Sequence, residues 1–376
     1  MPKYKFEQLA HNITDKKMPK PGDEELYVGL EHLDSGNLNV TRWGSKVELI
    51  GQKLVMKQGD ILFGRRNTYL RRASIAPHDG IFSAHGMIFR PRIDVIDPDY
   101  FPFFISSNYF MDAAINISVG SLSPTVNWKT LKELEFNIPT LDKQKKTAEL
   151  LKSINTTKEA YQELLFQSDE LIKAKFTEMF DERFENNRIK LNEIANPIIG
   201  LTYKPENKSE DGTLVLRSGN VQNGEMYIGD DIVRVKEVKI PEHKYIIPND
   251  ILMCSRNGSA DLVGKNCIIR KVDEKMTFGA FMTVIRTEFP NFLFGFFQSD
   301  YFKTQLNNVG TTSINQITSK MLNEYEVVLP TVEEEKTFAV FLKQVEKSKY
   351  ELKRAIQSTE NLIKSMLYKE LEREED

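Results

Sequence analysis

The sequence has few of the residues from which disulfide frameworks, zinc sites and membrane spans are made. Two of its 376 residues are cysteines, Cys254 and Cys267, which is too few for a disulfide framework or a cysteine-based zinc site. We expect both to be small core hydrophobes in a cytoplasmic protein. The apolar run NFLFGFF at 291–297 is far shorter than the about 20 residues of a membrane-spanning helix. The amino-terminal segment lacks the apolar core of a signal peptide, so no membrane partner is expected.

Motifs of catalysis and cofactor binding are also missing from the sequence. The five histidines are scattered, and neither an HxxxH nor a CxxC metal motif occurs. The sequence contains no GxSxG nucleophile motif, no phosphate-binding P-loop and no GxGxxG dinucleotide motif. DPDY at 97–100 lacks the second proline of an adenine-methyltransferase motif, and we expect it to be a turn before a short helix. The sequence therefore predicts a non-catalytic chain without a metal ion or a cofactor.

Charge is nearly balanced over the whole chain but unevenly distributed along it. The formal net charge is −3. Residues 62–92 hold six arginines against the single acid Asp79, and residues 251–271 hold four basic residues against the single acid Asp261. Two locally basic segments are typical of a protein that meets phosphate groups at two places. An ordinary solvated surface would carry the same charges, so charge alone leaves both interpretations open.

The strongest internal signal is a duplication of the chain. IPTLDKQKKTAELLK at 138–152 matches LPTVEEEKTFAVFLK at 329–343, with an offset of 191 residues. Four further pairs of segments preserve the same order: FEQLA (6–10) with LNEIA (191–195), GDILFGRRN (59–67) with NDILMCSRN (249–257), FSAHGMIFR (82–90) with FGAFMTVIR (278–286), and SSNYF (106–110) with QSDYF (298–302). Five matches in one order predict two copies of the same structural unit.

Each half begins with a region of mixed secondary structure. Short runs rich in β-branched or aromatic residues, such as DILFG, GMIFR, CIIR and MTVIR, alternate with turn signals and predict strands. YFPFFISSNYF (100–110) and NFLFGFFQSDYF (291–302) predict short buried helices packed on the sheet. The predicted fold class is therefore α+β, with two pseudo-symmetric globular domains at residues 1–139 and 181–330.

A long helix is expected after each domain, over residues 140–180 and 331–376. Each of these segments follows a proline, and neither contains a glycine or a proline. Thr331 and Glu334 form a capping-box pattern at the start of the second helix. At 1.5 Å per residue, each helix should be about 60 Å long.

Apolar residues of the two long segments recur three, four or seven positions apart, which is typical of a helix that pairs along a narrow stripe. Both copies interrupt this stripe at equivalent positions, first at Lys158 and Lys349 and then at Ser168 and Thr359. Matching interruptions favour pairing of the two helices with each other over separate docking of each helix on its own domain. The predicted contact residues of this coiled coil are Leu151, Ile154, Tyr161, Leu165, Ile172, Leu342, Val345, Leu352, Ile356 and Ile363.

The candidates for contact with DNA are concentrated in two matched basic loops, Arg65–Asn67 and Arg256–Asn257, which follow the strand-like runs DILFG and DILMCS. Arginine can donate two hydrogen bonds to guanine, and asparagine can form two hydrogen bonds with adenine. Each of these residues could instead pair with a surface acid or contact only phosphate. The full set of predicted DNA-contacting residues is Arg65, Arg66, Asn67, Arg71, Arg72, His85, Arg217, Asn220, Arg256, Asn257, Lys265 and Asn266.

A second pair of loops, rich in glycine, serine and threonine, precedes the long helices at 120–136 and 310–327. Polar side chains in these Gly-Ser/Thr loops could bond bases or phosphates, or could cap turns through local backbone bonds. They are Ser123, Thr125, Asn127, Ser313, Asn315 and Gln316.

Taken together, these features resemble the specificity subunits of type I restriction–modification systems. The resemblance rests on a Gly-Ser/Thr loop, a Leu-x-x-Leu/Tyr turn, an Ile/Leu-Pro strand end and a long helix, which all occur twice, and it covers essentially the whole chain. It implies a target-recognition domain in each half, an antiparallel coiled coil of the two helices, and recognition of a DNA site with two half-sites and an unspecified spacer.

The resemblance also implies the partners of the chain. These are double-stranded DNA and two modification subunits, which carry S-adenosylmethionine and the adenine-methylation chemistry; a restriction subunit can join them. The family has no fixed base-contacting residues, so the residues named above come from the pattern of this chain alone. The glutamine that usually follows the proline is Gln144 in the first copy and Glu335 in the second, and we expect this difference to alter a partner contact.

Other functions stay open on the sequence alone. One is a coiled-coil scaffold for protein interactions without a DNA role. Another is a degenerate enzyme that binds a small ligand between its halves. A third, in the same class as the main prediction, is the specificity subunit of a restriction system whose partner fuses cleavage with methylation.

Overall fold

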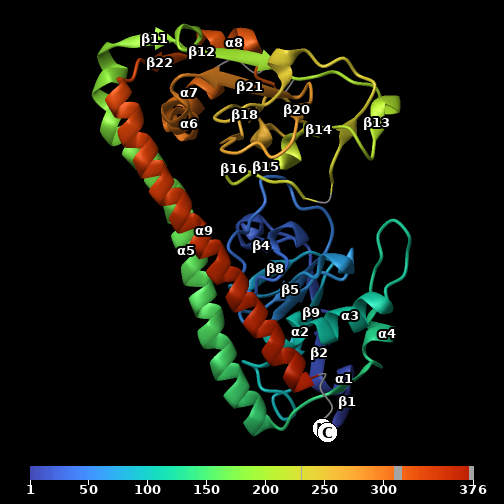
Figure 1. Cartoon of the computed structure of the whole chain (residues 1–376). Helices are drawn as coiled ribbons and strands as arrows, with labels where there is room; N and C mark the ends of the chain where they lie inside the picture. Colours follow the sequence, from blue (N-terminus) through green and yellow to red (C-terminus); the bar gives the residue numbers. More distant parts are fainter. Residues whose placement is uncertain (230, 309–315, 372–376) are drawn as a thin grey trace. The chain divides into compact units, whose positions relative to one another are not determined.

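The structure is a computed structural model that describes residues 1–229, 231–308 and 316–371. The chain forms two compact units, one of Met1–Gln162 with Lys353–Asp376 and the other of Glu163–Leu352. Each unit contains one globular domain together with part of each long helix (Figure 1).

The first domain is built on two four-stranded sheets. The strand order of one is β2-β9-β6-β7, with all neighbours antiparallel, and that of the other is β3-β5-β8-β4, in which β4 and β8 are parallel. A two-stranded ladder, β1-β10, joins the two ends of the domain. The strands are β1 (Lys3–Lys5), β2 (Ala10–Ile13), β3 (Lys16–Lys17), β4 (Tyr27–Val28), β5 (Lys53–Met56), β6 (Ile61–Phe63), β7 (Ala73–Ile75), β8 (Gly80–Phe82), β9 (Met87–Pro91) and β10 (Glu135–Asn137).

The second domain repeats this arrangement. Its sheet β12-β21-β18-β19 matches the first antiparallel sheet strand for strand, β14 and β20 form the equivalent parallel pair, and β11-β22 is the equivalent ladder. The strands are β11 (Arg188–Lys190), β12 (Ala195–Ile199), β13 (Lys208–Ser209), β14 (Thr213–Leu216), β15 (Val221–Gln222), β16 (Glu225–Met226), β17 (Arg234–Val235), β18 (Ile251–Cys254), β19 (Asn266–Ile268), β20 (Met276–Phe278), β21 (Met282–Thr287) and β22 (Glu326–Val328). The predicted duplication of an α+β domain is therefore confirmed.

A buried ion pair recurs at the same place in both domains. Asp60, 3% exposed, accepts two hydrogen bonds from Arg90 at 2.8 and 2.9 Å, and Asp250, 1% exposed, accepts two from Arg286 at 2.8 Å each. Each carboxylate also accepts a backbone N–H at the turn before its strand. A bidentate pair of this kind is specific in geometry, so its recurrence shows that the two domains share detailed packing as well as topology.

Short aromatic-rich helices cover one face of the antiparallel sheet in each domain, as predicted. Their phenylalanines are buried in each core and contact one another edge-to-face, for example Phe104 with Phe110 at 5.5 Å and Phe297 with Phe302 at 5.0 Å. The short helices are α1 (Phe6–Leu9), α2 (Phe101–Ser106), α3 (Asn108–Asn116), α4 (Trp128–Leu131), α6 (Pro290–Gln298), α7 (Asp300–Asn308) and α8 (Ser319–Glu324).

The two long helices are α5 (Leu141–Asn186) and α9 (Val332–Leu371). The predicted capping box is present, because Thr331 N–H donates to Glu334 Oε2 at 2.6 Å and Glu334 N–H donates to Thr331 Oγ1 at 3.2 Å. The helix α5 continues to Asn186, beyond the end expected at Phe180, because Phe184 on its last turns is buried against the second domain.

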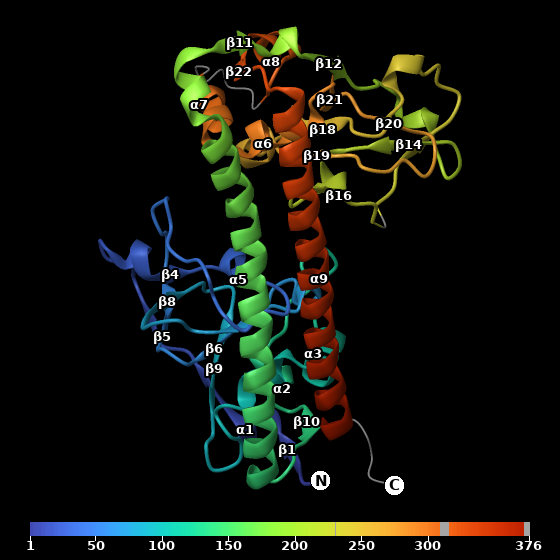
Figure 2. The same ribbon diagram turned by 60° about the vertical axis from the view of Figure 1, so that its left-hand side comes forward.

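In each unit α5 and α9 lie side by side and run in opposite directions, as both ribbon views show (Figure 2). In the first unit Leu151 of α5 belongs to the same buried cluster as Leu367 of α9. In the second unit Phe180 of α5 contacts Phe338 of α9, with ring centroids 6.3 Å apart. Because residues late in α5 meet residues early in α9, and the reverse, the pair is antiparallel.

The buried face of the helix pair is broader than the predicted stripe. Four predicted contact residues are buried, namely Leu151, Ile172, Leu342 and Val345. The other six are half-buried, namely Ile154, Tyr161, Leu165, Leu352, Ile356 and Ile363. The predicted stripe did not include Phe176, Phe180 and Phe184, which are 0 to 2% exposed. These residues are buried because their face of α5 packs on α6 of the second domain as well as on α9. A helix end enclosed by a domain needs a wider apolar face than a coiled coil alone.

Both cysteines are buried in the core of the second domain. Burial raises the pKa of the Cys267 thiol to about 12, which keeps it protonated near neutral pH. Within the described ranges no group of histidine, cysteine and acidic residues is arranged to hold a metal ion. None of the helices in the described part of the chain combines the length and the apolar character needed to cross a membrane.

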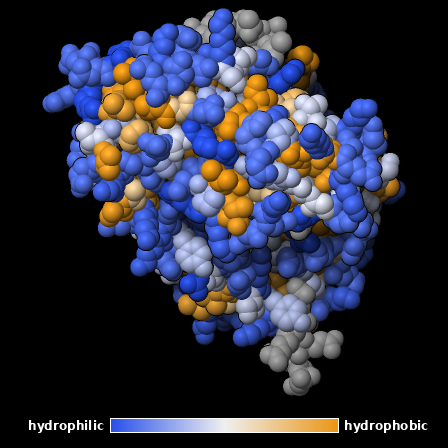
Figure 3. All heavy atoms as spheres, turned by 45° about the horizontal axis from the view of Figure 1, so that its top comes forward, coloured by the Kyte–Doolittle hydropathy of each residue, from blue (hydrophilic) through white to orange (hydrophobic). Residues whose placement is uncertain are grey.

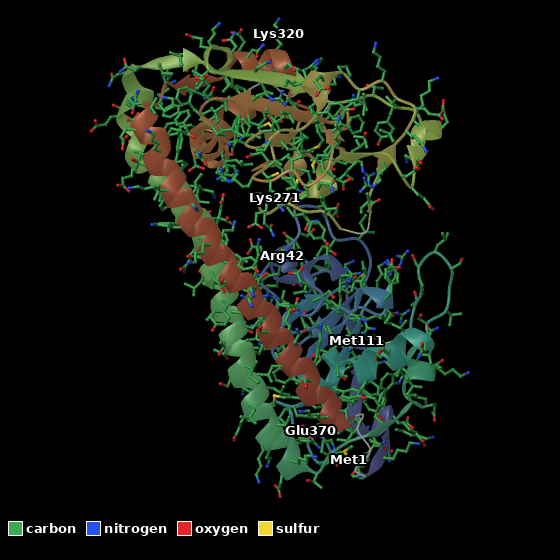
Figure 4. The ribbon with its side chains drawn as sticks, in the orientation of Figure 1. Met1, Arg42, Met111, Lys271, Lys320 and Glu370 are labelled. Atoms are coloured by element: carbon green, nitrogen blue, oxygen red, sulfur yellow. The ribbon has the colours of Figure 1, made fainter. Side chains whose placement is uncertain are left out.

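Glu370, on the last turn of α9, is a buried acid (Figure 4). It is 7% exposed and takes the place that Met179 holds in the first copy of the repeat. Its Oε1 atom has no hydrogen-bond partner among the residues that the structure describes. Burial raises the pKa of its carboxyl group, against the opposing effects of a hydrogen bond with Thr147 and the charge of Lys143.

We expect the variant Glu370→Met to be more stable than the wild type, with a gain that grows with pH. Above the raised pKa the folded protein must bury a charge that the unfolded chain exposes to water, whereas well below the ordinary pKa both states are protonated. The gain in free energy of unfolding should be about 1–2 kcal/mol at pH 8 and smaller at pH 4. Urea unfolding followed by the fluorescence of Trp128, which packs on the same core, measures it. A gain independent of pH would contradict the role of the charge.

Candidate nucleic-acid interface

In the first domain the structure joins the basic loop to the Gly-Ser/Thr loop that lies some 60 residues later in the chain. Arg66 and Thr125 form an antiparallel β-bridge, and Arg66 donates a side-chain hydrogen bond to Ser123 Oγ at 3.4 Å. The backbone N–H of Asn67 donates to Pro124 O at 2.8 Å. The two loops that the sequence analysis proposed separately therefore form one polar surface at the end of β6.

The second domain makes the same connection with different side chains. Arg256 and Gln316 form the equivalent antiparallel bridge, and Ile317 N–H donates to Ser255 O at 2.7 Å, as Val126 N–H donates to Arg65 O at 3.0 Å in the first domain. Both bridges follow a fully buried strand, β6 or β18, which gives each loop a rigid base. Ser313 and Asn315, the other candidates of this loop, lie outside the described residues.

A ring-bearing residue lies beside the arginine in the second domain. Phe281, on the turn between β20 and β21, is 57% exposed and lies under the Arg256 guanidinium, 5.2 Å from Arg256 Cζ to the ring centroid. Its backbone oxygen accepts the N–H of Arg256 at 3.0 Å. The equivalent residue of the first domain is His85, which is exposed on the turn between β8 and β9. His85 was among the residues predicted from the sequence and Phe281 was not, although the aligned segments 82–90 and 278–286 pair the two.

Backbone conformation helps to present the first basic loop. Asn67 has φ 53°, in the left-handed region, which asparagine adopts more readily than most residues. Its side-chain Oδ1 is buried without a hydrogen-bond partner in the described part of the chain. A buried amide oxygen without a partner is costly.

The second domain also contains a cavity of about 880 Å³ next to this surface. Phe281 belongs to its lining, as do two further aromatic residues, Tyr203 and Tyr227, and the polar residues Arg217 and Gln222. Tyr227 is 51% exposed. Figure 3 shows one face of the molecule, on which apolar residues form separate patches among polar and charged ones.

Several predicted DNA-contacting residues of the first domain are engaged inside the domain. Arg71 forms an ion pair with Asp112 and a hydrogen bond with Asn108 Oδ1 at 3.2 Å. Arg72 is half-buried and donates to Leu30 O at 2.8 Å. These contacts use the donors that base recognition would need, so Arg71 and Arg72 have structural partners, whereas Arg65, Arg66 and Asn67 lie together on the basic loop. His85 lies on the turn between β8 and β9.

The same distinction applies to the second domain. Four of its candidates form bonds inside the domain. Arg217 pairs with Asp231 at 2.6 Å, and Lys265 donates to Ser218 O at 3.2 Å. Asn220 bonds the backbone of Arg217 and Tyr227, and Asn266 bonds Gly264 O and Gln298. Asn220 and Asn266 are also buried, at 7% and 4% exposure. The two candidates left at the tip of the basic loop are Arg256, which is exposed, and Asn257, which is half-buried.

The glutamine and the glutamate that follow the two prolines make similar contacts with their own domains. Gln144 is fully buried and accepts the N–H of Asp97 at 2.7 Å, and Glu335 accepts the N–H groups of Asn291 and Phe292 at 2.9 and 2.8 Å. Both side chains therefore bind the domain that precedes their own helix. The effect of this difference on a partner contact stays a prediction.

Two copies of one α+β domain, each followed by a long helix and each with a basic loop joined to a Gly-Ser/Thr loop, define a duplicated protein with two equivalent polar surfaces. The family model described as "Type I restriction modification DNA specificity domain" matches this chain twice, at residues 26–165 and 185–359. The chain belongs to this family, which confirms the resemblance seen in the sequence.

Individual relatives agree with this assignment. The chain is 27% identical over 186 residues to the type I restriction enzyme StySPI specificity subunit of Salmonella potsdam, a match that covers 46% of this chain and 40% of the relative. It is 28% identical over 168 residues to the EcoKI specificity subunit of Escherichia coli (strain K12), covering 42% of this chain and 36% of the relative. These matches thus span less than half the length of both curated relatives.

A solved structure shares the fold. A chain from a study of complex assembly in a type I R-M system superposes with a TM-score of 0.54 at 16% identity, covering 98% of this chain and 96% of that chain. The likeness extends over both domains and both long helices and supports the architecture described above.

Proposed function

We propose that this chain is the DNA-reading specificity subunit of a type I restriction–modification complex, with one half-site of a bipartite DNA target recognised by each domain. The observation that carries this proposal is the duplicated bridge between the basic loop and the Gly-Ser/Thr loop, Arg66 with Thr125 and Arg256 with Gln316. Its backbone geometry is the same in the two domains, whereas the side chains it presents differ. That is the pattern expected of two readers of different sequences.

The chemistry of the two surfaces fits base recognition in the major groove. Arg66 and Arg256 are exposed at strand ends and can donate two hydrogen bonds to guanine. The ring of Phe281 lies next to Arg256 and can contact a thymine methyl group, whereas His85 at the equivalent place can donate or accept a hydrogen bond. The two domains would thus read different bases with a common frame.

The partners and the absence of catalysis belong to the same proposal. In it the chain binds double-stranded DNA and two modification subunits, which supply S-adenosylmethionine and adenine methylation, and restriction subunits can join the complex. The chain contributes target recognition and no catalytic residue. Arg66 and Arg256, exposed beside the bridges that join the two loops, fit a binding role.

The first test is whether Arg66→Ala and Arg256→Ala each affect one half-site. Loss of one bidentate base contact should weaken binding by about 1–3 kcal/mol, and sequence preference should relax at one position of one half-site only. Selection of binding sites from random duplexes, with the wild type and both variants in complex with their partner subunits, measures both effects. Arg188→Ala, which removes an exposed ion pair with Glu326, is the matched control and should leave selection unchanged.

Salt dependence separates this function from a protein-interaction scaffold. Each phosphate that a basic side chain neutralises contributes a slope of about −0.9 to the logarithm of affinity against the logarithm of salt concentration. A chain that binds duplex DNA without such a slope, or selects no sequence at all, is not a DNA-reading subunit.

A further inference from the structure

Each long helix buries one lysine against the domain that precedes it. Lys158 on α5 is 2% exposed and donates to Gly36 O at 3.0 Å. Lys349 on α9 is 4% exposed and donates to Asn223 O at 3.3 Å. The two lysines occupy the equivalent positions at which both copies interrupt the apolar stripe. The two lysine interruptions are therefore contacts with the domains.

The carbonyl groups that accept these bonds lie in equivalent turns. The turn at Gly36 follows the short helical turn Leu30–His32, and the turn at Asn223 follows Ser218–Asn220. Each turn has a glycine in the left-handed region, Gly36 at φ 72° and Gly224 at φ 74°. The same helix position thus binds the same turn in both copies, which two independent surface contacts would not do.

An acidic side chain accompanies each lysine. Lys349 Nζ also donates to Asp169 Oδ1 on α5 at 2.6 Å. The residue equivalent to Asp169 in the second copy is Glu360, which lines the same cavity as Lys158 in the first unit. Each lysine therefore bonds a turn carbonyl of its domain, and Lys349 also pairs with an acid of the partner helix, which offsets the cost of burying its charge.

A second polar contact lies 14 residues earlier on each helix. Gln144 precedes Lys158 by the same interval as Glu335 precedes Lys349. As described above, these residues accept N–H groups from the segments that lead into α2 and α6. The two contacts are about 21 Å apart along each helix and, two heptads apart, lie on the same face. Each domain is thus held to its helix at two separated points.

An apolar residue at the lysine positions would continue the stripe and bury more apolar surface. A polar group kept inside such a stripe generally lowers stability and selects one arrangement among several. The contacts at Gln144 and Glu335 lie where the helices also pack on the aromatic cores of the domains, and each lysine adds a polar contact farther along its helix that restricts the orientation of the domain. Orientation matters for recognition because base contacts require correct placement of the loops.

We propose that Lys158 and Lys349 are positioning residues that fix the orientation of the first and second recognition domains, respectively, on the helix pair. This inference rests on the proposed function and adds that recognition of each half-site depends on its own lysine.

The experiment uses the full chain with its partner subunits and three variants, Lys158→Met, Lys349→Met and the control Lys347→Met. Methionine keeps the length of the side chain and restores the apolar stripe, and Lys347 is exposed on the same helix as Lys349. Affinity is measured for duplexes with both half-sites intact and with either half-site scrambled. The half-sites are assigned to domains beforehand with Arg66→Ala and Arg256→Ala.

We expect Lys158→Met to reduce discrimination at the half-site of the first domain by at least about fivefold, the effect of one lost base contact, and to leave the other half-site unchanged. Lys349→Met should do the opposite, and Lys347→Met should change neither. Hydrogen exchange should become faster at the turn 34–37 in Lys158→Met only, and at the turn 222–225 in Lys349→Met only.

Three outcomes would overturn the inference. One is unchanged discrimination in both lysine variants, and another is an equal loss at both half-sites, which would indicate general destabilisation. Unaltered hydrogen exchange at both turns would show that the lysines do not hold them. If the wild type itself selects no bipartite site, the proposed function fails first, and hydrogen exchange still shows whether the lysines hold the turns.

Discussion

Replacing Phe176 with alanine is expected to lower the free energy of unfolding by about 3–5 kcal/mol. Phe176 is fully buried at the point where α5, α9 and the second domain meet. Its ring contacts Phe180 at 4.9 Å, Phe292 of α6 at 5.4 Å and Phe338 of α9 at 6.0 Å. Truncation would leave a cavity lined by α5, α6 and α9. Because the paired long helices are rigid, these elements cannot shift enough to fill the cavity.

The matched control for this prediction is Phe166→Ala. Phe166 lies on the same helix in the same unit but is 61% exposed, so its truncation should change stability by less than about 0.5 kcal/mol. Chemical denaturation followed by circular dichroism compares the two variants. An equal loss in both would mean that the surface around Phe166 is covered in solution and that the packing of Phe176 is not the decisive contact.

The second large effect is expected from shortening the helix pair by one heptad. Each long helix is continuous from one compact unit into the other, so its length is fixed at 1.5 Å per residue. Deleting residues 160–166 and 352–358 together removes seven residues from each helix and preserves the apolar register of the antiparallel pair. If the helices set the spacing of the half-sites, the deletion changes the preferred spacer and leaves both half-site sequences unaltered.

Binding to the original target should then fall by roughly 10³-fold, towards the level of non-specific binding, because only one half-site can be engaged at a time. Selection from random duplexes with variable spacers reports the new spacing. The matched control deletes no residue and replaces the seven α5 positions with other helix-forming residues that keep the stripe. An unchanged spacer in the deleted protein would show that the helices do not act as the ruler.

The repeat was visible in the sequence because duplication leaves matched segments in the same order and at similar intervals. The buried strands were predicted correctly in both halves because the runs DILFG and DILMCS are short and apolar. The aromatic helices were predicted from the apolar runs FPFF and FGFF. The capping box at Thr331 and Glu334 was predicted because it involves residues three positions apart. Local signals of this kind require no knowledge of the tertiary structure.

The candidate interface was only partly predictable. The sequence indicated both the basic loops and the Gly-Ser/Thr loops, but their union at Arg66–Thr125 and Arg256–Gln316 depends on strand register across about 60 residues. Arg71 and Asn266 looked equivalent to Arg66 in charge or polarity. Their engagement with Asp112 and Gln298 appeared only in the structure, because those partners lie on other helices.

By itself the sequence determined that the chain is a duplication, that each copy is an α+β domain with a long helix, and that the protein resembles DNA-specificity subunits. Tertiary structure decided which polar residues remain available to a partner and which are used internally. It also decided that the lysines interrupting the stripe bind the domains. The physical reason is that periodicity and local propensity act between near neighbours in the chain, whereas the partner of a buried charge is selected by packing among distant segments.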